Sequence, residues 1–371
     1  MSETVLITGG AGFIGSHVAD ELLARGHRVR ALDNLTPQVH GRDVGRPVYL
    51  ADDVELRRGD VRDADAVRRA LEGVDAVVHL AARVGVGQSM YEIAAYTSEN
   101  SAGTAVLLEQ LLDHPVRRLV VASSMSIYGE GSYATRAGVP TEAQERTREQ
   151  LERDEWEPRG PHGEQLVPLP TPESKRPSLA SIYALTKFEQ ERACLIFGDA
   201  YELPTVALRL FNAYGTRQAL SNPYTGALAI FASRLLNDRA PLVFEDGLQR
   251  RDFVSVRDVT QAFVAALESD AATGRAINIG TGRSVTVREV AEKLAATLGK
   301  SIEPELTGKY RVGDIRHCFA DIGLARELLG FEPRVELGHG MTELAEWLEG
   351  QVAEDRVERA SDELGARGLS R

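Results

Sequence analysis

Two side chains four residues apart, Tyr183 and Lys187, form the pair in this sequence best suited to acid–base chemistry. Residues at that spacing on a helix lie on one face, so the phenol and the ammonium would be neighbours. A phenol has a reference pKa of about 10, and moving it to near 7 requires roughly 4 kcal/mol of phenolate stabilisation. A nearby cation supplies stabilisation of that kind. The same spacing also arises on helices by accident, so the pair needs support from the rest of the chain.

A serine provides the first support. Ser124 follows the apolar run 116–122, which is typical of a buried strand. A hydroxyl at that place can hydrogen-bond the same substrate oxygen as Tyr183 and share its proton. We therefore expect Ser124, Tyr183 and Lys187 to be the catalytic residues.

Three glycines near the N-terminus provide the second line of support for a catalytic role of Tyr183 and Lys187. Gly9, Gly12 and Gly15 stand between an apolar run at 4–7, which predicts a strand, and a run with helical spacing at 14–25. A strand, a glycine turn and a helix N-terminus in that order form an anion site. Gly9 would permit the turn, Gly12 would let a pyrophosphate approach the backbone, and Gly15 would let helix and strand pack closely. The spacing is G-x-x-G-x-x-G rather than G-x-G-x-x-G, and an ordinary strand–turn–helix is the alternative.

The next strand favours a dinucleotide. The predicted strand 28–32 ends at Asp33, about 20 residues beyond the glycines, as the dinucleotide fingerprint requires. A carboxylate there accepts hydrogen bonds from a ribose 2′-hydroxyl and repels a 2′-phosphate, so NAD is favoured over NADP. The alternative is that Asp33 only caps a turn before Asn34. Ala81 and Ala82, small residues at the end of a buried strand, leave room for a flat ring. The positive charge of an oxidised nicotinamide would add to that of Lys187 in lowering the pKa of Tyr183.

The elements that must position these residues alternate along the chain. Strands followed by helices at this rhythm predict an α/β fold with a doubly wound parallel sheet, and ligands bind beyond the carboxyl ends of its strands. The predicted strands are 4–7, 28–32, 54–59, 74–82, 116–122 and 204–209, and the predicted helices between them are 14–25, 64–71, 91–112 and 181–197.

Beyond the sheet the pattern changes. We expect residues 1–203 to form an NAD-binding, Rossmann-type domain, and 204–350 to form mainly a smaller mixed α/β substrate lobe with some segments returning to the sheet. The region 131–178 reads as an insertion, with an exposed helix at 142–156 followed by a proline-stiffened loop typical of a lid. The charged residues 351–371 predict a solvated helix or a loose tail.

Composition excludes several classes of function. Of the 371 residues 43% are hydrophobic and 26% charged, as in an ordinary globular protein, and the net charge of −12 argues against a nucleic-acid partner. No run is long enough for a membrane span, and residues 1–4 lead straight into the first strand, so we expect no signal peptide. Cys194 and Cys318 cannot form a disulfide framework, which agrees with a cytoplasmic location. His162 has no second ligand beside it, so no metal is expected.

Taken together, these residues resemble those of the extended short-chain dehydrogenase/reductase family, which includes nucleotide-sugar epimerases and dehydratases. The resemblance covers roughly residues 5–348. It implies that Asp60 and Val61 lie near the adenine and that Lys187 also holds the nicotinamide ribose. Besides the residues already named, the cofactor site is expected to include Phe13, Ile14, Asn34, Leu80, Ala81, Ala82 and Asn100.

The resemblance also implies a substrate site. Asn212, Arg251 and Arg311 would clamp the diphosphate of a sugar nucleotide, and arginine offers phosphate the planar, bidentate donors that suit it. Ordinary surface ion pairing is the alternative for the two arginines. The expected substrate-binding residues are Ser124, Ser126, Asn212, Arg251, Arg311 and Asp314.

Two residues separate the chemistries of this family. Relatives that dehydrate the sugar resemble one another in having Asp-Glu after the serine or threonine, whereas this chain has Met125 and Ser126, neither of which is a strong acid or base. That favours inversion at C4 through a 4-keto sugar. The long segment 128–183 resembles that of 4-epimerases acting on dTDP-linked 6-deoxyhexoses of the rhamnose type, and a UDP-hexose is the other candidate. Two enzymatic alternatives remain: an NAD(P)H-dependent 4-keto-sugar reductase and a 4,6-dehydratase.

Two further predictions concern partners. A non-enzymatic nucleotide sensor is disfavoured, because sensors that resemble the family usually lack the Tyr-x-x-x-Lys pair. The helices 91–112 and 181–197 are candidates for a homodimer interface, as in relatives that form four-helix contacts.

Overall fold

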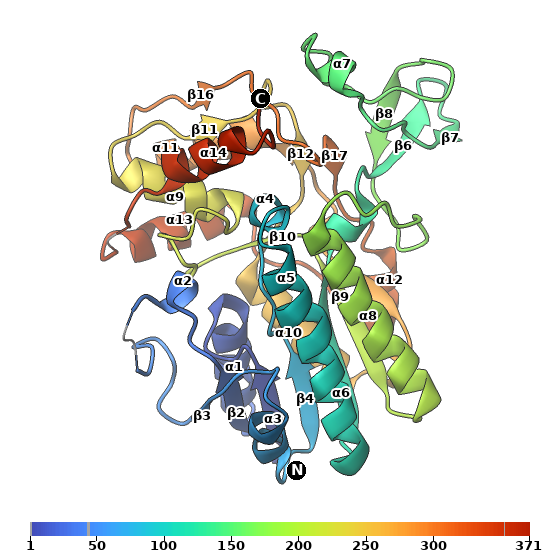
Figure 1. The fold of residues 1–371 in the computed structure, drawn as a ribbon, viewed down its shortest axis with the longest axis vertical. Helices are drawn as coiled ribbons and strands as arrows, with labels where there is room; N and C mark the ends of the chain where they lie inside the picture. The colour runs from blue at the N-terminus through green and yellow to red at the C-terminus, as the bar shows by residue number, and fades with distance from the viewer. Residues whose placement is uncertain (1, 43–44, 352) are drawn as a thin grey trace.

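Seven short runs of aliphatic and β-branched residues form the central sheet of the computed structural model, which describes residues 2–42, 45–351 and 353–371 (Figure 1). The strand order is β14-β9-β5-β4-β1-β2-β3, and each strand runs parallel to its neighbours. The predicted doubly wound α/β fold is confirmed. The strands are β1 (Thr4–Thr8), β2 (Arg28–Asp33), β3 (Glu55–Arg58), β4 (Ala76–His79), β5 (Arg118–Ser124), β9 (Thr205–Leu210) and β14 (Ala276–Ile279).

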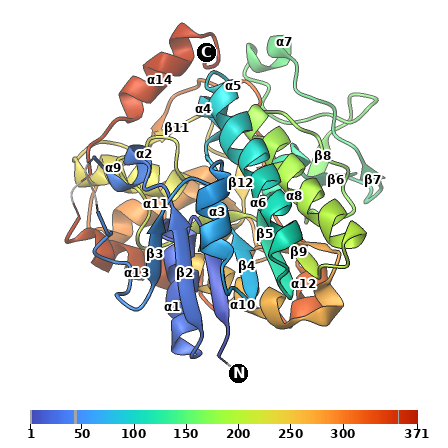
Figure 2. The same ribbon diagram turned by 60° about the horizontal axis from the view of Figure 1, so that its bottom comes forward.

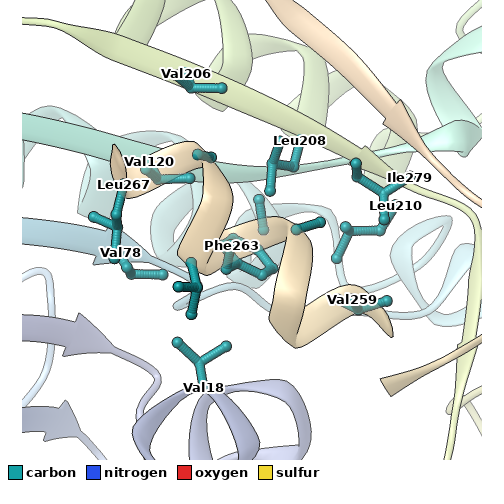
Figure 3. Packing of buried hydrophobic residues seen from close by; sticks show 14 of the residues in the cluster. Val18, Val78, Val120, Val206, Leu208, Leu210, Val259, Phe263, Leu267 and Ile279 are labelled. Atoms are coloured by element: carbon teal, nitrogen blue, oxygen red, sulfur yellow. The ribbon is translucent and has the colours of Figure 1, made fainter. Parts of the chain in front are cut away.

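Helices cover both faces of this sheet. On one face α1 (Phe13–Ala24) packs against α10 (Val256–Glu268), and Figure 3 shows Phe263 of α10 among valines and leucines of the sheet, with Val18 of α1 on its other side. On the opposite face α3 (Ala64–Leu71), α6 (Gly103–Asp113) and α8 (Ile182–Ala200) lie side by side (Figure 2). The helices thereby remove the apolar side chains on both faces of the sheet from water. This hydrophobic burial is the main force that holds the three layers together.

The chain changes direction within the sheet at β1. This strand pairs with β2 on one side and with β4 on the other, so the loops that leave β1 and β4 diverge and open a crevice at their carboxyl ends. Such a switch point is where ligands bind in open parallel sheets. Gly9 comes directly after β1, and Ala81 comes two residues after the end of β4, so both lie at this crevice.

The predicted helix 91–112 is interrupted. It consists of α5 (Ile93–Tyr96), a π-helical turn (Thr97–Ala102) and α6, with the short α4 (Val86–Ser89) before it. The turn carries Asn100, whose side chain bonds to the backbone of Arg83 on the neighbouring loop. Turns of this kind are rare and often stand at functional sites.

The predicted helix at 142–156 is wrong. Only α7 (Arg148–Leu151) is helical there, because Leu151 and Trp156 are drawn into a small apolar cluster with Tyr310. The rest of the insertion is not a proline loop alone but contains a three-stranded antiparallel sheet, in the order β7-β6-β8. Its strands are β6 (Ser132–Thr135), β7 (Pro140–Thr141) and β8 (Leu166–Leu169).

Buried ion pairs fasten the insertion to the C-terminal lobe. The guanidinium of Arg316 is fully buried and lies 2.6 Å from Glu157 of the insertion, 2.9 Å from Glu245 and 2.6 Å from Asp246. Arg146 of the insertion pairs with Glu245 at 2.7 Å. Charges taken out of water in this way need partners on several sides, and here both signs are supplied from both segments.

A second apolar core stabilises the C-terminal lobe, where α9 (Ala227–Leu236), α11 (Val287–Thr297) and α13 (Leu337–Leu348) pack together. α12 (Gly323–Leu329) returns to the large sheet beside β14. The remaining helix α2 (Pro37–His40) follows β2. Small sheets complete the lobe: β10 (Asn212–Tyr214) with β13 (Phe253–Ser255), β11 (Leu242–Val243) with β16 (Glu305–Leu306), and β12 (Arg250–Arg251) with β15 (Val285–Thr286) and β17 (His317–Cys318).

The C-terminal segment forms a helix and is tied down. α14 (Val357–Ala366) buries Ala360 and Leu364, and the final residues pair with the loop at Tyr310 through hydrogen bonds such as Val312 N to Leu369 O (3.0 Å). Of the two forms expected for this segment, a solvated helix and a loose tail, the structure shows the helix. Within the described residues no helix is long and apolar enough to cross a membrane, and no cluster of His, Cys, Asp and Glu could hold a metal ion.

Candidate active site

A cavity of about 470 Å³ opens at the carboxyl ends of the central strands, and most of the predicted site residues line it. They come from seven parts of the chain: the glycine turn, the ends of β2, β3, β4 and β5, the start of α8, and β10. The predicted residues that line the cavity are Gly9, Gly12, Phe13, Ile14, Gly15, Asp33, Asn34, Asp60, Val61, Leu80, Ala81, Ala82, Ser124, Ser126, Tyr183, Lys187 and Asn212.

The glycine turn fits a dinucleotide phosphate. Gly9 has φ +72°, and a Cβ there would stand 2.9 Å from the backbone nitrogen of Ala81. A Cβ on Gly15 would come within 2.3 Å of the Gly9 carbonyl oxygen. Glycine at these two positions lets the turn pack closely against the end of β4 and the start of α1. Gly12 and Gly15 line the cavity at the positive end of that helix, which favours an anion.

Asp33 caps a turn, which was the alternative considered for it. One carboxylate oxygen accepts a hydrogen bond from Ala11 N (3.0 Å) and the other from Leu35 N (2.9 Å), so the residue caps the turn that follows it and braces the glycine turn. It also lines the cavity. A negative group braced in this way suits a ribose hydroxyl and opposes a phosphate on the same ribose.

Asp60 and Asn34 lie together at the same end of the cavity. Asn34 Nδ2 donates to Asp60 Oδ2 at 3.2 Å. A hydrogen bond from Arg62 holds the pKa of Asp60 at about 2, against the opposing effect of burial. The carboxylate is therefore ionised at any physiological pH and acts only as a hydrogen-bond acceptor.

The three predicted catalytic residues line the cavity on the β5 side of the sheet. Tyr183 and Lys187 project from the first turns of α8, and Ser124 ends β5. The backbone nitrogen of Tyr183 donates to Ser89 Oγ (3.0 Å), and Ser124 Oγ accepts from Ser126 N (3.1 Å), so neighbouring loops hold both. Burial lowers the pKa of Lys187 to about 8, which leaves it mostly charged near neutral pH.

The pKa of Tyr183 moves opposite to the predicted direction in the chain by itself. Burial raises it, and the hydrogen bond with Ser124 only partly opposes that rise. The spacing of Tyr183 and Lys187 predicts the neighbouring charge but carries no information on how far water is excluded. An additional positive charge in the cavity is therefore needed before the phenol can act as a base.

On the side of the C-terminal lobe, the cavity wall contains polar atoms without partners. Asn212 Oδ1, the Tyr214 hydroxyl and Gln218 Oε1 are all buried, and none has a hydrogen-bond partner among residues 2–42, 45–351 and 353–371. All three residues line the cavity. The Tyr214 hydroxyl is packed against Gly340 of α13, so these residues line the cavity while their unpaired atoms lie within its wall.

Four predicted residues do not line this cavity. Asn100 is buried behind it, where its amide joins the backbone of Arg83. Arg251 and Arg311 both lie close to Asp314, at 3.7 Å and 2.8 Å, so the ion pairing considered as an alternative is present. Arg311 and Asp314 line a small adjoining hollow of about 10 Å³, which shares Val86 with the main cavity and is covered by Leu364 of α14.

Sequence reasoning missed several cavity residues. Gln38, Asn222 and Tyr224 line the cavity, and Gln38 Nε2 donates to Asn222 Oδ1 at 3.1 Å across it. Gln38 lies on the single-turn helix α2, and Asn222 and Tyr224 lie on an irregular segment, so none belongs to a periodic pattern. The turn composition around Asn222 was the local signal. The positive charge of Arg83, on the loop after β4, is compensated by ion pairs with Glu92 (2.5 Å) and Glu99 (3.0 Å).

Comparison with known proteins agrees with this geometry. Residues 5–167 and 161–280 match the NAD dependent epimerase/dehydratase family. The chain is 36% identical to a dTDP-L-rhamnose 4-epimerase of Burkholderia thailandensis, over 93% of this chain and 94% of that protein.

Solved structures give the same picture. The chain is similar to UDP-glucose 4-epimerase of Thermotoga maritima with UDP-glucose, with a TM-score of 0.77 at 30% identity, over 93% of this chain and 98% of that one. It is also similar to the complex of Thermus thermophilus UDP-glucose 4-epimerase with NAD, with a TM-score of 0.74 at 31% identity, over 94% and 100%.

Proposed function

The chain belongs to the NAD dependent epimerase/dehydratase family, and from this premise we propose that it inverts C4 of a nucleotide-diphosphate sugar. One observation carries the proposal: Ser124, Tyr183 and Lys187 line the same cavity as the glycine turn and Asp33. The hydroxyl, phenol and ammonium needed for oxidation of an alcohol are therefore within one enclosure with a dinucleotide site.

The chemistry of the side chains follows from their positions. Tyr183 accepts the proton of the sugar 4-hydroxyl, while Ser124 hydrogen-bonds the same oxygen and holds it in place. NAD, held by the glycine turn and Asp33, would supply the hydride chemistry at C4. Lys187, charged below about pH 8, stabilises the phenolate that Tyr183 must become. After the 4-keto sugar has turned over, Tyr183 gives the proton back and the alcohol has the opposite configuration.

The residues after Ser124 support inversion over dehydration. Met125 and Ser126 both line the cavity, and neither side chain can act as a strong acid or base there. Elimination of water across neighbouring sugar carbons requires one group to remove a proton and another to protonate the leaving oxygen. The reaction that needs a single proton carrier is the better match.

The substrate we propose is a dTDP-linked 6-deoxyhexose of the rhamnose type. The 36%-identical relative is named for such an activity. The cavity lining supports a sugar without a charge at C6, because Val84, Val86 and Met125 are apolar and the charge of Arg83 is compensated. A UDP-hexose is the second candidate, since the Thermotoga maritima relative is solved with UDP-glucose.

We propose that the two parts of the chain, each with its own apolar core, bind different ligands. Residues 1–203 bind NAD, and 204–350 supply most of the contacts to the sugar nucleotide, with Asn212 in the cavity wall. Arg251 and Arg311 bind the diphosphate by exchanging their contacts with Asp314 for phosphate oxygens.

A reducing, cytoplasmic setting is supported by two buried, free cysteines, Cys194 and Cys318.

A substrate panel tests the proposal directly. The purified protein is incubated with dTDP-, UDP- and GDP-sugars without added cofactor, and inversion at C4 is followed by proton NMR. We expect interconversion of a dTDP-6-deoxyhexose pair with no net oxidation. Conversion that consumes NAD(P)H in equal amount would instead identify a 4-keto-sugar reductase, and loss of water would identify a dehydratase.

A further inference from the structure

A buried glutamine beneath the cavity has no part in the reaction described so far. Gln190 lies on α8 three residues after Lys187, and only 1% of its surface is exposed. Its Oε1 accepts a hydrogen bond from the ammonium of Lys187 at 2.8 Å. An amide hidden from water persists only where its hydrogen bonds are satisfied, so this contact is built into the fold.

The orientation of the Gln190 amide has one solution. Its Nε2 lies 2.8 Å from Thr104 Oγ1 and 3.3 Å from the carbonyl oxygen of Ala81, which can only accept. The Lys187 ammonium on the other side can only donate. The oxygen must therefore face Lys187, and the nitrogen must face β4 and α6.

The nitrogen side is held by a buried chain of hydrogen bonds. Thr104 donates to the Asn100 carbonyl (2.6 Å), so its oxygen accepts from Gln190 and from His79 Nε2 at 2.9 Å. His79 Nδ1 lies 2.7 Å from Thr8 Oγ1 on β1. Burial lowers the pKa of His79 to about 3, with Lys187 adding to the effect, so the imidazole is neutral and the chain of bonds carries no charge.

The neighbouring carboxylate is engaged elsewhere. Glu191, next to Gln190 on α8, accepts from Arg209 at 2.6 Å and 2.9 Å and from Ser123 at 2.6 Å. The titratable groups that influence Lys187 are Cys194 and Glu191 on its own helix and His79 on β4. No carboxylate among the described residues makes a salt bridge with Lys187, so its direct acceptor is the neutral amide.

We propose that Gln190 is a positioning residue, which fixes the Lys187 ammonium on the face of α8 that carries Tyr183 and leaves its positive charge uncompensated. The inference rests on the proposed function, in which Tyr183 must lose its proton to act. An amide gives Lys187 a directional acceptor without the negative charge of a carboxylate, which would cancel the field that favours the phenolate. The link to the Ala81 carbonyl ties the same residue to the loop that bounds the cavity.

Two replacements separate shape from charge. Gln190→Glu keeps the length and the acceptor but adds a negative charge, and we expect about tenfold lower kcat near neutral pH with KM changed less than about twofold. The acid limb of the kcat profile should move to higher pH by about 1 unit, since that is the same tenfold effect on one ionisation. Gln190→Met keeps the volume and removes the hydrogen bonds, and we expect a fall of about tenfold or more at every pH.

A second readout does not depend on turnover. The Tyr183 phenolate is titrated by ultraviolet difference absorption of the NAD-loaded protein, with Tyr183→Phe as the blank. Its pKa should rise in Gln190→Glu and Gln190→Met. Gln261→Glu is the matched control, because Gln261 is an exposed glutamine on α10 that does not line the cavity. That variant should titrate and turn over like the wild type.

The outcomes separate the inference from the proposed function. If Gln190→Glu folds, as judged by an unchanged melting transition, and keeps the wild-type titration and kcat profile, Gln190 is structural only and the inference is wrong. If Gln190→Met fails to fold, Gln190→Glu alone decides. If the wild type inverts no sugar of the panel, the proposed function fails, while the titration still tests the hold of Gln190 on Lys187.

Discussion

Tyr183 is the residue on which turnover should depend most. Its phenol lines the cavity from α8 and is the proton carrier of the proposed reaction. Tyr183→Phe removes one oxygen atom, so we expect kcat to fall about 10²–10⁴-fold, the usual contribution of a positioned acid or base. NAD retained after purification should not change, because the glycine turn and Asp33 are intact. Tyr201→Phe, an exposed position at the end of the same helix, is the control and should keep full activity.

A second prediction concerns acid stability. His79 is fully buried, and burial lowers its pKa to about 3, whereas an unfolded chain has about 6.5. Between those values the unfolded state binds a proton that the folded state does not, so stability falls as pH falls from 6.5 toward 3. This group alone should cost about 1 kcal/mol between about pH 7 and pH 5.5.

Urea unfolding at the two pH values measures that loss. His79→Gln is the comparison, since it keeps a polar side chain but cannot take up a proton in this range. The wild type should lose more stability than the variant over the interval. Equal losses would mean that His79 is protonated inside the fold. His17, whose pKa burial lowers to about 4, acts in the same direction in both proteins and cancels from the difference.

Residues of the site could be predicted where the signal is local. Gly9, Asp33 and the Tyr183–Lys187 pair each stand next to a strand end or a helix start that the sequence pattern indicates. Asn222 could not be found in this way, because its partner Gln38 is 184 residues distant in the chain. Gln190 stands one turn from Lys187, but its amide is oriented by Thr104, 86 residues distant, which no local pattern indicates. The pKa of Tyr183 was also out of reach, since burial depends on the whole enclosure.

At the scale of elements, the strands of the sheet were predictable and the insertion was not. The middle of the buried strand β5, residues 119–122, is continuously apolar, and neighbouring strands repeat such apolar runs along the chain. The stretch 142–156 is rich in Glu, Arg and Gln, which favours an exposed helix on composition alone. Arg146, within this stretch, and Glu157, just after it, instead form ion pairs with residues beyond 240. No local sequence pattern indicates such distant pairing.

Those ion pairs give a prediction about how the insertion is held. Arg316→Met removes a fully buried guanidinium and leaves Glu157, Glu245 and Asp246 without it. Breaking one partner of a buried network costs about 3–5 kcal/mol, so the urea midpoint should fall markedly. Arg326→Met is the control: its pair with Glu332 is exposed on the surface and should be worth at most about 1 kcal/mol. A midpoint equal to that of the control would show that the insertion is held by packing alone.

At the scale of the molecule, the alternation of strands and helices predicted the layers, because a right-handed crossover leaves parallel strands few other arrangements. The C-terminal lobe was predicted less well in detail. Its strands are two or three residues long and pair with partners distant in sequence, as β12 does with β17. A single sequence carries little signal for such short pairings.

The outer face of α5, α6 and α8 gives the last prediction, that the protein is a homodimer. The helices α5, α6 and α8 lie side by side at the surface (Figure 2). Leu185 and Ile196 lie on one side of α8 and are 39% and 58% exposed, and Ile93 and Leu112 are exposed on the adjoining helices. A two-fold axis through this face would bury each apolar side chain against a copy of the same surface. The wild type should sediment as a dimer, and Leu185→Glu with Ile196→Glu should weaken association by about 100-fold or more, because like charges would face one another without water. Val139→Glu adds the same charge at an exposed site of the insertion and should leave the dimer intact. A dimer that survives the double replacement would place the interface on another face.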